Sequence, residues 1–291
     1  MNMKNLLEDL FEKMRMIHLF RRTAERLTEK EIEDLATIDE SFEGRPNRQA
    51  DSSSYHNFGI RSLGTGNAFF YGLTRLSIDQ RRQFTMLAKN KQYQWLLAEA
   101  FEVFQDFMWK SYALVGSIDR NFWPLEDYGN ISLSELSGKD FSWFYEQAKK
   151  KKKNIRGIIK LYRKKRPALA KLEQQNALNY DLRVFLPLIE QLRHVIVHCG
   201  GAIVNKDEFI KEVLDTEGLY KNGRIDSQTR LILDIPFGQK EYANTVALLE
   251  QQDKDVPIFE HQRFELFTEC LMSYAHAVAK NLILQDSDFE D

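Results

Sequence analysis

The longest pattern in the chain is a stripe of large apolar residues between about Ser77 and Ser117. Its members follow one another at steps of three or four residues: Leu97, Phe101, Phe104, Met108, Tyr112 and Val115. This spacing is typical of one face of an α-helix. A second row widens that face: Leu96, Ala100, Val103, Phe107 and Leu114. A helix with so broad an apolar surface is buried on two sides, which predicts a core built from packed helices.

Three other segments show the same periodicity. Residues 3–38 carry a stripe from Leu7 to Ala24, residues 178–196 carry a second, and a third runs from Phe264 to Leu282. Between the first stripe and Ser77, glycine, proline and serine in residues 41–67 are typical of a loop. We therefore expect a mainly α-helical bundle with an N-terminal helical extension, divided into helices and linker at 1–66 and a helical domain at 67–291.

A small β insertion is predicted at about residues 202–238. Tyr220–Ile225 contains an Asn-Gly pair between apolar residues, which favours a two-residue hairpin turn. The apolar run Arg230–Ile235 ends at Pro236 and is typical of a further strand.

The overall composition excludes several classes of protein. The net charge is −2, so any nucleic acid has to be met by a local patch. Two cysteines, Cys199 and Cys270, are too few for a disulfide scaffold. There is no run of 18 apolar residues and no N-terminal signal pattern. We expect a cytoplasmic protein that does not contact a membrane.

One segment, residues 149–166, is strongly basic. It holds eleven cationic residues: Lys149, Lys150, Lys151, Lys152, Lys153, Arg156, Lys160, Arg163, Lys164, Lys165 and Arg166. No acidic residue occurs between Lys149 and Lys171. Interleaved isoleucines and leucine indicate a helix with one docked face. The cations form either a solvated helix face or a surface that binds RNA phosphates.

The most chemically suggestive string is Arg193-His194-Val195-Ile196-Val197-His198-Cys199-Gly200-Gly201. It ends an apolar helical run, and the glycines supply a helix stop. Pro187 inside this run predicts either a kink or a restart of the helix. At about 100° per residue, Arg193 and His198 flank the line from Glu190 to His194 on one broad face.

Histidine and arginine on one rigid helix suit metal-free cleavage of RNA. A histidine, with an ordinary pKa of about 6.5, can take the proton of a ribose 2′-hydroxyl. An arginine can stabilise charge on the phosphate through its planar fork.

This string resembles the signature of the HEPN superfamily, whose ribonuclease members carry Arg, four to six residues, then His. Arg193 and His198 have four residues between them, His194 is the polar residue after the arginine, and the likeness in helix order covers about residues 84–285. The resemblance implies an endoribonuclease, toxin or antiviral effector that works as a homodimer without cofactor or metal. Arg193 and His198 would be catalytic, Glu190 and His194 supporting, and an antitoxin or other regulator a partner. Gly200 stands where antitoxin-modified members carry a tyrosine.

Other interpretations stay open at this stage. The chain could be a non-catalytic HEPN-like module that binds nucleic acid or a protein, or a helical structural protein whose string is coincidental. Arg193 could form an ion pair with Glu190, and His198 could cap the helix C-terminus. His194 and His198 are also spaced as a metal-binding pair, although no third ligand is evident.

Overall fold

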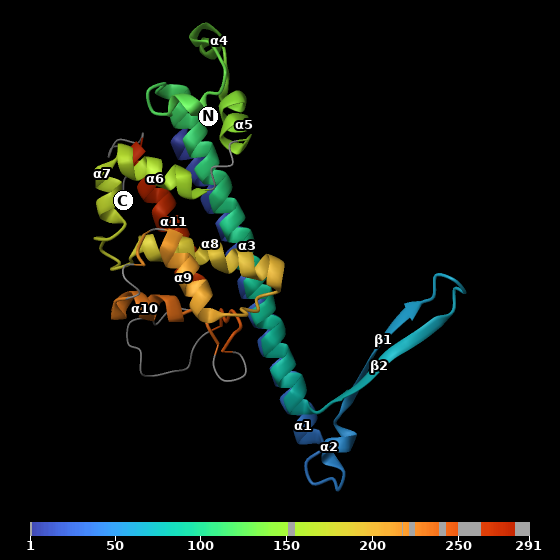
Figure 1. Ribbon diagram of the computed structural model, residues 1–291. Coiled ribbons are helices and arrows are strands. Elements are labelled where there is room, and N and C mark those ends of the chain that lie inside the picture. The colour runs from blue at the N-terminus through green and yellow to red at the C-terminus, as the bar shows by residue number, and fades with distance from the viewer. Residues whose placement is uncertain are drawn as a thin grey trace. The chain divides into compact units, whose positions relative to one another are not determined.

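The computed structural model describes residues 2–150, 155–216, 218–220, 225–238, 243–249 and 263–282. Within them the chain is mainly helical, with one small antiparallel sheet (Figure 1), which confirms the predicted fold class. The chain forms two compact units. Unit 1 is Met1–Leu19 with Tyr93–Asp291, and unit 2 is Phe20–Gln92.

Unit 1 contains the first part of helix α1 (Met3–Ser41) and the later part of α3 (Ile78–Ile118). Its remaining elements follow in chain order: η1 (Leu125–Asp127), α4 (Leu133–Ser137), α5 (Phe141–Lys150), α6 (Ile155–Lys165), α7 (Pro167–Leu172), α8 (Leu182–Cys199), α9 (Lys206–Thr216), α10 (Ser227–Asp234) and α11 (Arg263–Leu282).

The core of unit 1 lies where α3, α8 and α11 bring their apolar stripes together. The predicted stripe of α3 is buried throughout, from Leu97 to Val115. Phe104 of α3 meets Tyr274 of α11 with ring centroids 6.2 Å apart, and Phe185 of α8 meets Phe267 of α11 at 6.4 Å. Because these apolar side chains leave water together, the three helices hold one another in place.

Helix α8 begins at a side-chain cap and continues past an internal proline. Its cap is Asp181, whose carboxylate accepts a hydrogen bond from the Arg183 N–H at 3.1 Å. Leu178, expected in the stripe, precedes the helix and is exposed. The helix runs through Pro187, which excludes the restart, one of the two alternatives that the sequence left open there.

Unit 2 contains the rest of α1, the short α2 (Arg48–Asp51), the hairpin of β1 (Ser54–Arg61) and β2 (Ala68–Leu76), and α3 as far as Gln92. Sequence patterns predicted a loop for much of this segment. Gly64-Thr65-Gly66-Asn67 instead connects two paired strands, and Gly66 has a φ of +71°. Residue 66, the predicted domain boundary, therefore falls inside the hairpin connection.

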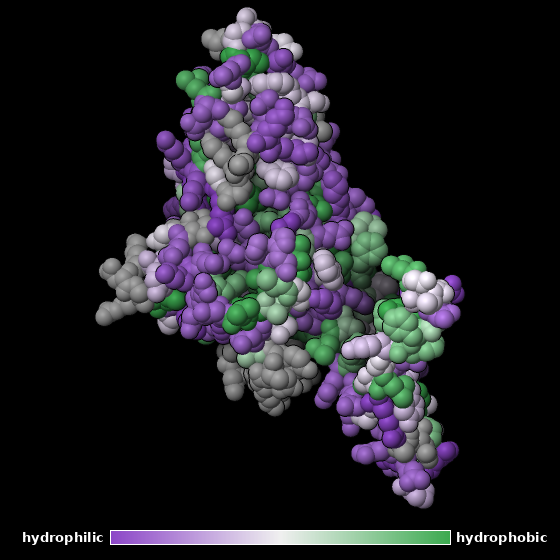
Figure 2. Space-filling model, turned by 45° about the vertical axis from the view of Figure 1, so that its right-hand side comes forward, coloured by the Kyte–Doolittle hydropathy of each residue, from purple (hydrophilic) through white to green (hydrophobic). Residues whose placement is uncertain are grey.

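The hairpin exposes most of its apolar side chains. Phe58 faces Tyr71 across the strands, and Ile60 faces Phe69. Phe58 is 67% exposed and Tyr71 is 76% exposed. Figure 2 shows green, hydrophobic residues at the surface of the hairpin.

In the described residues of 202–238, helices α9 and α10 stand where the β insertion was predicted. Residues 206–216 form α9, and the predicted strand Arg230–Ile235 lies largely within α10. The carboxylate of Asp226 caps α10 by accepting from the Thr229 N–H at 2.9 Å, and burial of Ile232 and Leu233 favours the helix. The Asn-Gly turn at 222–223 lies outside the described residues.

Candidate functional site

Two glycines fix the end of α8 and with it the position of the predicted catalytic residues. Gly200 is the left-handed cap with a φ of +62°, and Gly201 has a φ of +85°. A Cβ on Gly201 would come within 2.5 Å of the Gln94 side chain. Gln94 is buried and donates a hydrogen bond to the Val246 carbonyl at 2.7 Å. Only glycine fits at Gly201, since both the conformation and the close approach exclude a side chain.

Side chains in the last turns of α8 point either into the core or to the surface. Leu192 and Ile196 are fully buried, whereas His194 and His198 are exposed. The two imidazole rings are adjacent, with centroids 4.6 Å apart and planes at 50°. The imidazole of His198 lies in the last turn of α8 and makes no hydrogen bond or ion pair with any described residue.

Arg193 is held by a residue that the sequence did not indicate. Its guanidinium forms an ion pair with Glu102 of α3 and is about one third exposed. The ion pair of Arg193 with Glu190, which the sequence left open as an alternative, is not formed. The Nε of Arg193 is buried and has no hydrogen-bond partner in the part of the chain that the structure describes.

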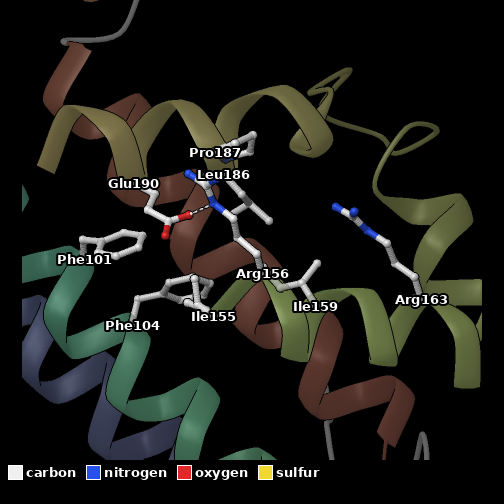
Figure 3. Close-up of a pocket in the computed structure, with 9 residues that line it drawn as sticks. All are labelled: Phe101, Phe104, Ile155, Arg156, Ile159, Arg163, Leu186, Pro187 and Glu190. Atoms are coloured by element: carbon white, nitrogen blue, oxygen red, sulfur yellow. Dashed lines mark hydrogen bonds and ion pairs between the residues drawn. The ribbon is translucent and has the colours of Figure 1, made fainter. Parts of the chain in front are cut away.

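Glu190 pairs instead with Arg156 of the basic segment. Figure 3 shows Arg156 reaching from α6 to the Glu190 carboxylate on α8, beside Phe101 of α3. Both side chains of the pair are about one fifth exposed. A space of about 10 Å³, enough for one water, lies between them and Pro187.

These groups open onto a hollow of about 390 Å³ at the surface of unit 1. Its walls include Glu190 and His194, predicted as supporting residues, Arg193, predicted as catalytic, and Arg156. Further lining residues come from α3, α8 and α9: Phe101, Gln105, Gln191 and Glu212. His198 does not line the hollow and adjoins it through the ring of His194.

The other described cations of the basic segment lie outside the hollow and differ in their contacts. Lys149 lies over the Tyr145 ring at 4.9 Å, and Lys150, Lys160 and Lys164 are exposed. Lys165 donates to the Asn121 carbonyl at 3.0 Å, and Arg166 donates to that of Asn281 at 3.1 Å. Lys151, Lys152 and Lys153 lie outside the described residues. RNA binding by the whole segment stays a prediction.

Arg163 has a different role from Arg156, although both lie on α6. Its Nε contacts the fully buried Glu173 carboxylate at 2.5 Å. The hydroxyl of Tyr274 donates to the other oxygen of that carboxylate at 3.0 Å. Burial, reinforced by Glu173, raises the pKa of Tyr274 well above its ordinary value, so the phenol keeps its proton and donates it. This cluster is a structural contact inside unit 1.

Sequence reasoning found the residues on α8 but not their partners. Glu102 and Glu212 are surface acids separated from Arg193 by many residues along the chain, and no local pattern distinguishes them from other acids. The spacing of the apolar stripe did place Phe101 on the buried side of α3, which leaves Glu102 near the edge of the packed face.

The described residues contain no group of three or more His, Cys, Asp or Glu side chains that could hold a metal ion. None of the described helices combines the length and apolar character needed to cross a membrane. Comparison of the chain with protein family models, with curated proteins and with solved structures finds no match.

Proposed function

We propose that the protein is a metal-independent endoribonuclease of HEPN type that cuts RNA with Arg193 and His198. The observation that carries the proposal is the end of α8. There, two adjacent exposed histidines and a partly buried arginine stand beside an open hollow on one rigid helix. Groups that must be held in a reactive geometry are best placed on such an element.

The chemistry needs a base, an acid and a cation. His198 takes the proton of a ribose 2′-hydroxyl, and the oxygen attacks the neighbouring phosphorus. The bond from phosphorus to the 5′-oxygen breaks, and that oxygen receives a proton from an acid. The products are a 2′,3′-cyclic phosphate and a 5′-hydroxyl. Arg193 stabilises the added negative charge on the phosphate, and His194 orients His198 through their ring contact.

The proposal includes a homodimer, because one chain supplies one such helix and a second copy would supply the acid. A cytoplasmic toxin or antiviral effector fits this activity, with an antitoxin or other regulator as its partner. These finer statements depend on the HEPN resemblance of the Arg193–Gly201 string.

Cleavage of total RNA and tRNA by the purified protein in EDTA tests the proposal. Wild-type protein is expected to leave cyclic-phosphate ends, and His198→Ala is expected to lose about 100-fold or more of the rate. His56→Ala removes another exposed histidine, from the hairpin, and serves as the matched control. Equal cleavage by His198→Ala and wild type would contradict the proposal.

One observation favours a second candidate, a non-catalytic module that binds nucleic acid or a protein. Arg193 is occupied by Glu102, and the hollow carries Glu190 and Glu212 beside its arginines. Binding that survives His198→Ala, with intact RNA in every reaction, would select this function.

A further inference from the structure

Two arginines at the hollow are held in the same way by carboxylates from neighbouring helices. Arg156 of α6 is paired with Glu190 of α8, and Arg193 of α8 is paired with Glu102 of α3. Glu190 and Arg193 are one helical turn apart, so both arginines reach the same wall of the hollow. Of the eleven cations in the basic segment, Arg156 is the one that lines this hollow in the described residues.

We propose that Arg156 and Arg193 together form the binding site for one RNA phosphate, and that Glu102 and Glu190 occupy the guanidinium groups until the phosphate arrives. This inference rests on the proposed function, because it assumes that RNA enters the hollow. Arg156 is then a binding residue contributed by α6, and the two glutamates are positioning residues.

The exchange is chemically balanced. A phosphate and a carboxylate both present oxygens that a guanidinium binds by charge-assisted hydrogen bonds, so the arginines trade one such partner for another. The hollow is open to water, which receives the released carboxylates. Glu102 is about half exposed already, so its ion pair with Arg193 is weak and its release into water costs little free energy. The Nε of Arg193 has no hydrogen-bond partner among the described residues, so Glu102 does not satisfy the guanidinium completely.

The two ion pairs also explain why two positively charged arginines can line one hollow before a ligand binds. Each glutamate cancels one positive charge and fixes the direction of one guanidinium. The arginines are therefore already oriented when the phosphate arrives, which reduces the entropy lost on binding.

Binding of a single-stranded 2′-O-methyl RNA oligonucleotide, measured by fluorescence anisotropy, tests the inference. This probe lacks the free 2′-hydroxyl and cannot be cut by the proposed reaction. Arg156→Ala is expected to weaken binding about tenfold or more, because it removes hydrogen bonds to a charged group. Lys160→Ala removes an exposed cation from the same helix, outside the hollow, and should have a much smaller effect.

The salt dependence of RNA affinity shows whether Arg156 contacts a phosphate. It would not change if Arg156 had only a structural role. Complete loss of one phosphate lowers the slope of log affinity against log salt concentration by about 0.7 for a single strand, and loss of one of its two arginines lowers the slope by part of that amount. Arg156→Ala should show this change and Lys160→Ala should not. Arg156→Lys keeps the charge, so it should retain the slope while losing part of the affinity.

Glu102→Gln is expected to strengthen binding several-fold, since it removes the charge that competes with phosphate, while the amide oxygen can still accept a hydrogen bond from Arg193 and orient the guanidinium. Glu99→Gln removes the same charge from an exposed position one turn earlier on α3 and controls for long-range electrostatics. Thermal unfolding confirms that each variant is folded. Adenosine monophosphate, added as a competitor, distinguishes a site for free nucleotides from one that requires a strand.

Equal affinities for Arg156→Ala, Lys160→Ala and wild type would overturn the inference, as would an unchanged affinity for Glu102→Gln. Displacement of the strand by stoichiometric adenosine monophosphate would also overturn it in favour of a free-nucleotide site. The two proposals fail separately. Intact RNA with Arg156-dependent binding would refute cleavage alone, whereas His198-dependent cleavage that ignores Arg156 would refute the shared phosphate site alone.

Discussion

The pair of Arg163 with Glu173 and the pair of Arg193 with Glu102 use the same chemistry in opposite surroundings. Glu173 is fully buried and receives hydrogen bonds from both Arg163 and Tyr274. Glu102 is about half exposed, and its partner Arg193 retains a donor without a partner among the described residues. A buried, satisfied pair belongs to the fold, while an open and incompletely satisfied pair can give up its carboxylate to a ligand.

The largest effect should come from breaking the buried pair. Glu173→Ala leaves the Arg163 charge and the Tyr274 hydroxyl without their partner inside unit 1. We expect the free energy of unfolding to fall by roughly 3–5 kcal/mol, measured by urea denaturation. A loss below about 1 kcal/mol would remove the distinction between the two pairs.

Arg193→Ala should affect chemistry far more than stability. If Arg193 stabilises the phosphate, the cleavage rate falls by about 100-fold to 1,000-fold. The midpoint of urea denaturation should stay close to that of wild type, because the pair is partly exposed. A variant that unfolds as readily as Glu173→Ala, with normal specific cleavage when folded, would assign Arg193 to the fold.

Removal of a single hydroxyl from the buried cluster should have an intermediate effect. Tyr274→Phe keeps the ring in the core and removes only the hydrogen bond to Glu173. The expected loss of unfolding free energy is about 1.5–3 kcal/mol, the usual range for a bond to a charged group. Tyr145→Phe, at a partly exposed hydroxyl that donates to Asp106, provides the control and should cost less.

The smallest effect on stability should come from Glu102→Ala. Partly exposed ion pairs contribute about 0–1 kcal/mol, so its denaturation curve should nearly overlay that of wild type. Increased RNA affinity with unchanged stability would sharpen the contrast with Glu173. A loss of several kcal/mol would show that the pair with Arg193 holds α3 and α8 together.

The sequence predicted the features that depend on residues close together in the chain. It did not predict those that depend on residues far apart in the chain. The spacing of Leu192 and Ile196 defined the buried face of α8, and the two glycines defined its end, because both signals are local. The partners of Arg193 and Arg156 could not be predicted, since each pairing joins helices that meet only in the folded chain.

The hairpin was missed because its glycines and serines resemble a loop, although aromatic residues at Phe58 and Phe69–Tyr71 favour strands. Residues 230–235 were predicted as a strand from their apolar run, but the Asp226 cap and the burial of Ile232 and Leu233 produce a helix.

Pro187 makes the backbone hydrogen bonding of α8 weaker at one point along the helix than elsewhere. A proline inside a helix has no N–H to donate to the carbonyl four residues earlier, which here belongs to Arg183. The backbone ladder is therefore weakest one turn before Glu190, between the half that contains Phe185 and the half that carries Arg193 and His198. In hydrogen–deuterium exchange, amides just after Pro187 should exchange faster than those around Leu192. Opening would then start at the base of the half that carries Arg193 and His198, on a helix that is otherwise firmly packed.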